Sequence, residues 1–302
     1  MQEMALIYSG PHRIVLNQNA KNLGFGEHVN RVFQFFTGEA VVMAAGDDIS
    51  LPNRVSALAR AWGNHGRPPA VGSGFVEIDK TGVEIGGVPL WVIDEMAGFV
   101  SERKTCIEDF FISGSYVVSG ATAMWSRALI EKLGRIPDGI ICEDRVLSLV
   151  SWLMGRPVVI NEPLVKYRRH DQNAWGKIFE WDGSKKSYLH GEMDTAAKSA
   201  MMVDNHNAYQ AILTEWFNNA QIDSKDYAKW SHLNTKTRAI YFFRKNWWEW
   251  TFAQKSKSIF GSILTGFSLD QIWWKLQRLI GLNQYCWLRE KGRRLKHARR
   301  ER

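Results

Sequence analysis

The sequence predicts an α/β domain over residues 1–175, followed by a mainly helical region over residues 176–302. Before residue 175, short apolar runs alternate with helix-like stretches, the pattern of strands connected by helices. After it, strand-like runs fade, and apolar residues recur at spacings of three and four, which is typical of helices. The chain of 302 residues is 45% hydrophobic and 23% charged, so it has the composition of a globular protein that can bury a core.

Four apolar runs are the predicted strands of the first domain: 12–18 (HRIVLNQ), 40–46 (AVVMAAG), 69–78 (PAVGSGFVEI) and 157–164 (PVVINEPL). The tetrapeptide DKTG at 79–82 predicts a tight turn between two strands. In the second region, residues 192–220 predict helix, because their apolar positions follow helical spacing.

Cysteine usage and hydropathy narrow the location of the protein. Cys106, Cys142 and Cys286 lie far apart and show no CxxC spacing, so neither a disulfide framework nor a cysteine metal site is expected. The N-terminus has no basic-then-apolar leader, and no apolar run reaches eighteen residues, so neither secretion nor a membrane span is expected. We expect a cytoplasmic protein, with peripheral contact at the inner face of the membrane left open.

Two adjacent aspartates, Asp47 and Asp48, follow the predicted strand at 40–46. Adjacent carboxylates repel each other, but they become useful when a divalent cation lies between them and a phosphate. The pair therefore raises the hypothesis of a metal–nucleotide site. The alternative is a solvated turn in which Ser50 caps a helix whose first turn holds Pro52.

The glutamate–aspartate pair Glu143-Asp144 and the sequence YRRH at 167–170 are further polar clusters of the first domain. On residue type alone, the acidic pair is also typical of the first turn of a helix, where the helix dipole favours negative charge. In the same way, YRRH is also typical of a basic surface turn. Trp125, in SGATAMW, is either a sugar-stacking side chain or a core residue.

Three segments occur in a characteristic order: 19–55, with Asn22, Gly24, Asn30 and Asp47-Asp48; 119–134 (SGATAMWSRALIEKLG); and 141–173, with Glu143-Asp144-Arg145 and Tyr167-Arg168-Arg169-His170. Together they resemble the inverting nucleotide-sugar glycosyltransferases of family 2, which have a Rossmann-like GT-A fold. The resemblance covers about residues 10–175. It rests on the combination of the segments, because GDD or EDR alone is a weak signal.

The resemblance implies a role for each candidate site residue. Asp47 and Asp48, with His170 closing the site, would bind Mg²⁺ or Mn²⁺ against the diphosphate of a nucleotide-sugar donor. The nucleotide contacts it implies also include Asn22, Arg168 and Arg169. Asp144 would act as the catalytic base, and Glu143 would orient it or the acceptor. Gly120 and Thr122 would lie under the acceptor sugar, where small residues allow close approach of the backbone.

The sequence departs from the family pattern in two places. Ala45 occupies the first position of the acidic motif that is often written D-x-D-D, so only the aspartate pair remains. In addition, the family begins with two βα units, roughly 60 residues by the size of a βαβ unit, that hold the base and ribose. We therefore expect this chain to be truncated at its N-terminus and to lack the base pocket, which leaves its activity by itself in question.

The C-terminal region is rich in tryptophan and basic residues. From Tyr285 to Arg302 the chain has eight Arg and Lys against two Glu, which gives +6 of the total net charge of +8. Within residues 258–282 a predicted amphipathic helix has one apolar stripe and off-stripe polar residues. The stripe is Ile272, Leu276, Leu279 and Ile280, and the off-stripe residues are Lys275, Gln277 and Arg278. Such a helix suits either an anionic membrane surface or ordinary packing against the protein.

The expected function is metal-dependent transfer of a sugar, with inversion, from a nucleotide-sugar donor to a saccharide or lipid-linked acceptor in polysaccharide or glycolipid biosynthesis. A non-catalytic binding or scaffold protein derived from a glycosyltransferase is the alternative that missing strands would favour. Nucleic acid is not the expected partner, since only the basic tail favours it and no base-reading module is visible.

Overall fold

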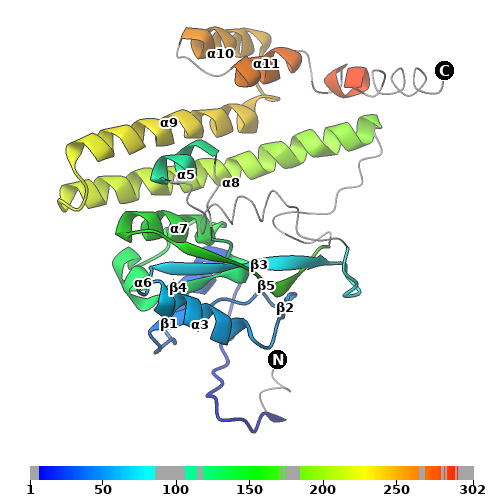
Figure 1. The fold of residues 1–302 in the computed structure, drawn as a ribbon. Helices are drawn as coiled ribbons and strands as arrows, with labels where there is room; N and C mark the ends of the chain where they lie inside the picture. The colour runs from blue at the N-terminus through cyan, green and yellow to red at the C-terminus, as the bar shows by residue number, and fades with distance from the viewer. Residues whose placement is uncertain are drawn as a thin grey trace. The chain divides into compact units, whose positions relative to one another are not determined.

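The computed structural model describes residues 7–85, 106–113, 118–170, 173, 184–264, 269–279, 282, 284–289 and 291. The chain forms two compact units, Met1–Arg168 and Arg169–Arg302. All strands of the described residues belong to the first unit, and the described elements of the second unit are helices (Figure 1). The predicted α/β domain followed by a helical region is thus confirmed, whereas the boundary predicted at residue 175 lies outside the described residues.

The first unit is built around a curled, five-stranded mixed sheet. Its elements are α2 (Phe25–Phe33), β1 (Ala40–Val42), β2 (Ile49–Ser50), α3 (Arg54–Asn64), β3 (Ala70–Ile78), α5 (Ile107–Ser113), the 3-10 helix η1 (Gly120–Thr122), β4 (Met124–Ser126), α6 (Arg127–Leu133), α7 (Glu143–Met154) and β5 (Val158–Arg168). The strand order is β1-β4-β3-β5-β2. Of these neighbours, β3 and β5 run parallel, and the other pairs run antiparallel.

Apolar faces of two helices bury the sheet from opposite sides (Figure 1). On α3, Ala57, Leu58 and Ala61 follow helical spacing and pack with Val71 and Leu164 from the two central strands. On the other side, α7 has a run of fully buried residues, which includes Leu147, Leu149 and Val150. Trp125 on β4 is fully buried as well, so its sugar-stacking alternative is wrong and it is a core residue.

The pairing of β3 with β5 shifts in register and ends just before a tight turn that follows β3. The pairing shifts between Ser73 and Gly74 and again between Gly74 and Phe75, and it ends with Ile78 opposite Arg168. After β3, the side chain of Asp79 accepts hydrogen bonds from the backbone N–H groups of Thr81 and Val83. The predicted turn at 79–82 is therefore confirmed, with Gly82 at a positive φ of 94°.

Two local predictions were wrong. Residues 12–18 do not form a strand, and Ile14, Val15 and Leu16 remain about half exposed, because no described strand pairs with this segment. Ser50 is not a helix cap: it lies in β2, and α3 begins at Arg54 after Asn53.

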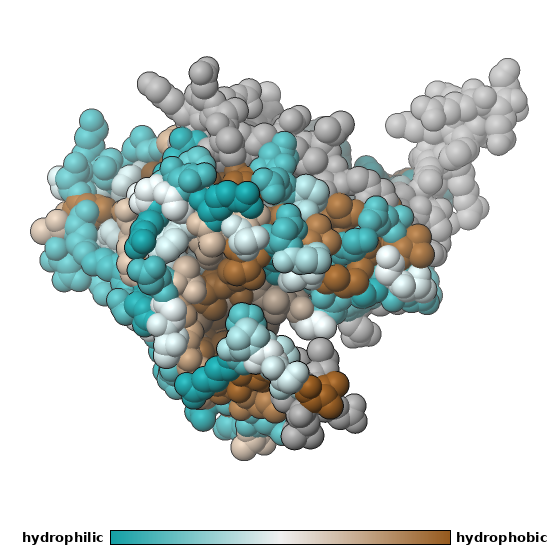
Figure 2. Space-filling view, turned by 60° about the horizontal axis from the view of Figure 1, so that its bottom comes forward, coloured by the Kyte–Doolittle hydropathy of each residue, from teal (hydrophilic) through white to brown (hydrophobic). Residues whose placement is uncertain are grey.

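Figure 2 shows that hydrophobic surface is exposed between hydrophilic areas on one face of the molecule.

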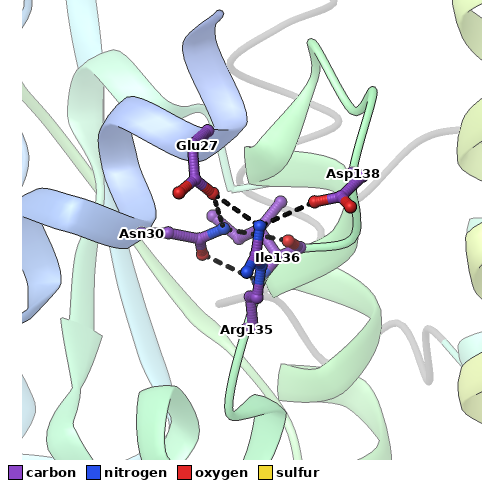
Figure 3. A network of polar contacts seen from close by, with 5 residues as sticks. All are labelled: Glu27, Asn30, Arg135, Ile136 and Asp138. Atoms are coloured by element: carbon purple, nitrogen blue, oxygen red, sulfur yellow. Dashed lines mark hydrogen bonds and ion pairs between the residues drawn. The ribbon is translucent and has the colours of Figure 1, made fainter. Parts of the chain in front are cut away.

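Helix α2 is held to the loop after α6 by a polar network (Figure 3). Asn30 donates to the carbonyl of Ile136 and accepts from its N–H group, at 3.0 and 2.8 Å. Arg135 forms ion pairs with Glu27 and Asp138 at 2.8 and 2.7 Å. Asn30, which belongs to the segment that carries the family resemblance, thus has a structural role in connecting residues that are 106 positions apart.

The second unit consists of α8 (Lys185–Asn218), α9 (Ser224–Asn246), α10 (Phe252–Leu264) and α11 (Leu269–Gln277), followed by further helical residues at 284–289. The predicted helix at 192–220 is confirmed by α8, which lies beside α9 (Figure 1). Between the two helices, the imidazole of buried His206 makes a 2.6 Å hydrogen bond with the side chain of buried Asn234. Within the described residues, no helix combines the length and apolar character needed to cross a membrane.

On α11 the structure buries an off-stripe lysine and exposes part of the apolar stripe. Lys275, expected on the polar face, is buried, whereas Leu276, expected on the apolar stripe, is 44% exposed. Arg278 is also turned inward and forms a bidentate ion pair with Glu192 on α8, with contacts of 2.6 to 3.1 Å. Ile280 and most of the basic tail lie outside the described residues.

Candidate functional site

Helix α7 begins with the acidic pair Glu143-Asp144, which lies against η1. The N–H group of Gly120 donates a 3.1 Å hydrogen bond to Asp144 Oδ2. Glu143 is buried and Asp144 half-buried. A Cβ atom on Gly120 would lie 2.8 Å from Glu143 Oε1, so glycine is what allows this close approach. The structure thus joins two of the segments that carry the family resemblance.

Burial changes the protonation of this pair. The pKa of Glu143 is raised to about 8, chiefly by desolvation and in addition by the neighbouring charge of Asp144. Desolvation also raises the pKa of Asp144, but the charge of Arg145 and the hydrogen bond from Gly120 oppose that shift. The Gly120 hydrogen bond favours the ionised form of Asp144, whereas burial favours the protonated form of Glu143.

The second acidic pair lies between β1 and β2. Asp47 is exposed and Asp48 half-buried. Asp48 Oδ1 accepts a 2.8 Å hydrogen bond from the N–H group of Arg168, while Asp48 Oδ2 is buried without a hydrogen-bond partner among the described residues. Desolvation raises the pKa of Asp48, and the charge of Asp47 adds to this effect. A buried carboxylate oxygen without a donor is a suitable ligand for a cation.

Arg168 fixes the position of this acidic loop. Its Nε donates to the carbonyl of Asp47 at 2.8 Å, and its Nη1 donates to the carbonyls of Asp79 and Lys80 at 3.0 and 3.1 Å. The guanidinium group, predicted to face phosphate, is therefore engaged by backbone carbonyl groups. Through these hydrogen bonds, Arg168, the last residue of β5, contacts both the acidic loop and the turn after β3.

Sequence reasoning missed Arg54, which connects the two acidic pairs. This buried side chain donates to the carbonyls of Met43 and Ala121 and to the hydroxyl of Ser50. It therefore contacts both ends of the loop that holds Asp47 and Asp48, and also η1, which holds Gly120. The signal was present in the sequence, because Arg54 precedes Ala57, Leu58 and Ala61 on the apolar face of α3.

We expect Arg54→Met to destabilise the first unit by roughly 2–4 kcal/mol, because it leaves buried carbonyl groups without a donor. Urea unfolding of the full chain measures this loss. The matched control is Arg60→Met on the same helix, where the side chain is exposed and the change should be within about 0.5 kcal/mol. Equal stability of the two variants would contradict the structural role of Arg54.

Asn22, Arg169 and His170 are the remaining predicted site residues. Asn22 is exposed before α2, where its side chain accepts a 2.9 Å hydrogen bond from the N–H group of Gly24. Arg169 and His170 are the first residues of the second unit, and the N–H group of His170 donates to Asn173. Among the described residues, no three His, Cys, Asp or Glu side chains form a cluster that could hold a metal ion.

Two hollows in the described part of the chain are lined by residues outside the acidic pairs. One, of about 650 Å³, belongs to the first unit and is lined by residues that include His65, Arg67 and Arg156. The other, of about 720 Å³, lies along α8 and α9 and is lined mainly by polar residues such as Asn207, Gln210 and Arg238. Neither lining contains a residue that the sequence assigned to the site.

Comparison with known proteins gives no assignment, since no protein-family model matches this chain and no curated protein matches it significantly.

Proposed function

We propose that this chain is the catalytic part of a metal-dependent, inverting glycosyltransferase with a GT-A fold, which moves a sugar from a nucleotide donor to a saccharide or lipid-linked acceptor. The observation that carries the proposal is the connection of the two acidic pairs through Arg54 and η1. One pair offers a half-buried carboxylate with a free oxygen, and the other offers two carboxyl groups of unequal protonation. Sugar transfer needs one site of each kind.

Asp47 and Asp48 would hold Mg²⁺ or Mn²⁺, which supplies the positive charge that offsets the leaving diphosphate. The buried Oδ2 of Asp48 supports this fit, because a magnesium site of this kind needs only one or two carboxylates beside phosphate and water. Arg168 and Arg54 keep the loop in place through the hydrogen bonds described above. His170, Asn22 and Arg169 remain predicted contributors.

Asp144 would accept the proton of the acceptor hydroxyl group as that oxygen attacks the anomeric carbon from the face opposite the diphosphate. The new bond forms as the bond between the anomeric carbon and the phosphate oxygen breaks, so the configuration inverts. Glu143, which keeps its proton near neutral pH, would orient Asp144 or the acceptor through a hydrogen bond. Gly120 would let the acceptor approach the backbone beside both carboxyl groups.

Nucleotide binding tests the proposal. In a chain extended upstream of Met1 by the two βα units that the resemblance implies, calorimetry should show tighter binding of a nucleoside diphosphate in Mn²⁺ than in EDTA. Asp48→Asn removes a ligand charge, so it should abolish most of that difference, by about tenfold or more in affinity.

The matched control is Asp138→Asn, an exposed carboxylate of the same unit whose partner is Arg135. It should bind as the unchanged protein does. Equal affinity in Mn²⁺ and EDTA would contradict the metal assignment, and absence of nucleotide binding in the extended chain would favour a non-catalytic binding protein.

A further inference from the structure

The helices at the end of the second unit show an inverted distribution of charged and apolar side chains. On α10, Lys255 is 5% exposed, whereas Phe252 and Phe260 are 68% and 64% exposed. On α11, Lys275 is 2% exposed and Trp273 is 60% exposed. A helix on the surface of a protein in water usually has the opposite arrangement, with apolar side chains inward and lysine outward.

The buried cations have specific partners inside the unit. Lys275 Nζ lies 2.9 Å from Ser258 Oγ and 2.5 Å from Ser262 Oγ, both on α10, and 3.4 Å from the centre of the Phe243 ring. Lys255 Nζ lies within 6 Å of the rings of two neighbouring tryptophans, at 5.7 and 5.4 Å from their centres. The inward orientation of these lysines is therefore fixed by contacts, and it leaves the aromatic side chains on the outside.

The exposed apolar residues recur on consecutive helical segments: Phe252 and Phe260 on α10, Trp273 and Leu276 on α11, and Trp287 and Leu288 in the helical residues 284–289. We call this set the aromatic surface. Trp273 and Leu276 are three residues apart, so they lie on one face of α11. Because two members are leucines, which offer no ring for base stacking, burial in an apolar medium fits the set better than nucleotide stacking.

Positive charge accompanies the aromatic surface. Lys257, Arg289 and Lys291 are exposed, and Lys291 Nζ lies 4.0 Å from the centre of the Trp287 ring. From Phe252 to the C-terminus the sequence has twelve Lys and Arg against three Asp and Glu, a net charge of +9. Since the whole chain carries +8, the preceding 251 residues carry −1. A partner that contacts this region must therefore offer both an apolar layer and negative charge.

We propose that the aromatic surface binds the interface of a membrane that contains anionic lipid. Phe260, Trp273 and Leu276 enter the boundary between headgroups and acyl chains, while exposed lysine and arginine side chains contact the lipid phosphates. The inference does not depend on the chemistry proposed for the first unit. Its own test involves neither metal nor nucleotide.

The test is sedimentation of the full chain with vesicles of phosphatidylcholine alone or with 30% phosphatidylglycerol, about a third of the lipid being anionic. At physiological salt, the chain should bind the anionic vesicles more tightly. The double variant Phe260→Ser, Trp273→Ser should weaken that binding roughly 10- to 100-fold, since each exposed aromatic ring contributes burial in the interface. Both side chains are exposed, so circular dichroism and the unfolding midpoint should stay unchanged.

Phe35→Ser provides the matched control, because this phenylalanine is 45% exposed but belongs to the first unit. It should bind vesicles as the unchanged chain does. The proposal is overturned if the double variant binds vesicles normally, or if the unchanged chain binds single-stranded DNA more tightly than anionic vesicles. It is also overturned if the chain sediments as a dimer that the double variant dissociates, because the aromatic surface would then be covered by a second copy.

Discussion

Asp144→Asn lowers turnover by roughly 10²- to 10⁴-fold, the usual contribution of a general base, when sugar transfer is assayed in the extended chain. Asparagine keeps the shape of the side chain and can still accept the Gly120 hydrogen bond, but it cannot take a proton from the acceptor. Binding of the donor should change little, since the donor's diphosphate is assigned to Asp47 and Asp48. The measurement is initial rate against donor concentration, with donor affinity determined separately by calorimetry.

Exposed Glu131 on α6 provides the control for general effects of neutralising a carboxylate. Glu131→Gln should keep full turnover. If Asp144→Asn also kept it, the base would have to be another group, and Glu143 would be tested next. If instead Asp144→Asn lost donor binding together with turnover, the residue would belong to the donor site rather than to proton transfer.

In the Glu143→Gln variant, the free energy of unfolding of the first unit depends less on rising pH than in the unchanged chain. The folded-state pKa of Glu143, about 8, lies above the ordinary value of 4.5, so the folded chain holds this proton more tightly than the unfolded chain does. The stability from this group is full below about pH 4.5 and is lost as the pH rises toward 8. Relative to the unchanged chain, Glu143→Gln should gain about 2–4 kcal/mol between pH 5 and pH 8.

Urea unfolding at a series of pH values measures this gain. Glu131→Gln again serves as the matched variant, and its stability should follow that of the unchanged chain across the range. A Glu143→Gln variant with the pH dependence of the unchanged chain would mean that Glu143 ionises without an energetic penalty. The unequal protonation that supports the proposed roles of Glu143 and Asp144 would then be wrong.

Sequence patterns predicted the strands of the first unit well for segments that have a neighbouring strand to pair with. The runs at 40–46 and 69–78 contain β1 and β3, the run at 157–164 covers only the first part of β5, which continues to Arg168, and the turn at 79–82 follows from its own residues. The run at 12–18 has the same apolar character but forms no strand. A strand needs hydrogen bonds from a neighbour, and the composition of a segment does not reveal whether that neighbour is present.

The site was harder to predict than the sheet. Sequence order and the family resemblance selected Asp48 and Asp144, but not Arg54, whose role depends on contacts with Met43 and Ala121 from distant parts of the chain. Arg168 was selected for phosphate, and the structure shows its guanidinium group bound to backbone carbonyl groups. Charged residue types indicate that a polar partner exists, whereas only the fold determines whether the partner is a ligand or the backbone.

The same limit applies to α11. Helical periodicity separated the apolar stripe from the off-stripe residues, but it left open which of them face inward. The hydroxyl groups of Ser258 and Ser262, which bind this lysine, come from another helix and were not recognised as its partners. When a lysine has such hydroxyl and aromatic partners, these contacts favour its burial, and a hydropathy pattern alone does not reveal them.

Because the register between β3 and β5 shifts, the contacts of the acidic loop depend on the number of residues in β5. Between Val71 and Ile78 on β3, the paired part of β5 runs from Val158 to Arg168 and so contains extra residues, and this offset brings Arg168 opposite Ile78. Loss of a single residue before Pro163 would advance the rest of the strand by one position and turn Arg168 toward the other face of the sheet. Asp48 would then lose its backbone donor although neither acidic pair had been altered. Among related chains, insertions and deletions within β5 should therefore be rarer than substitutions at its exposed positions.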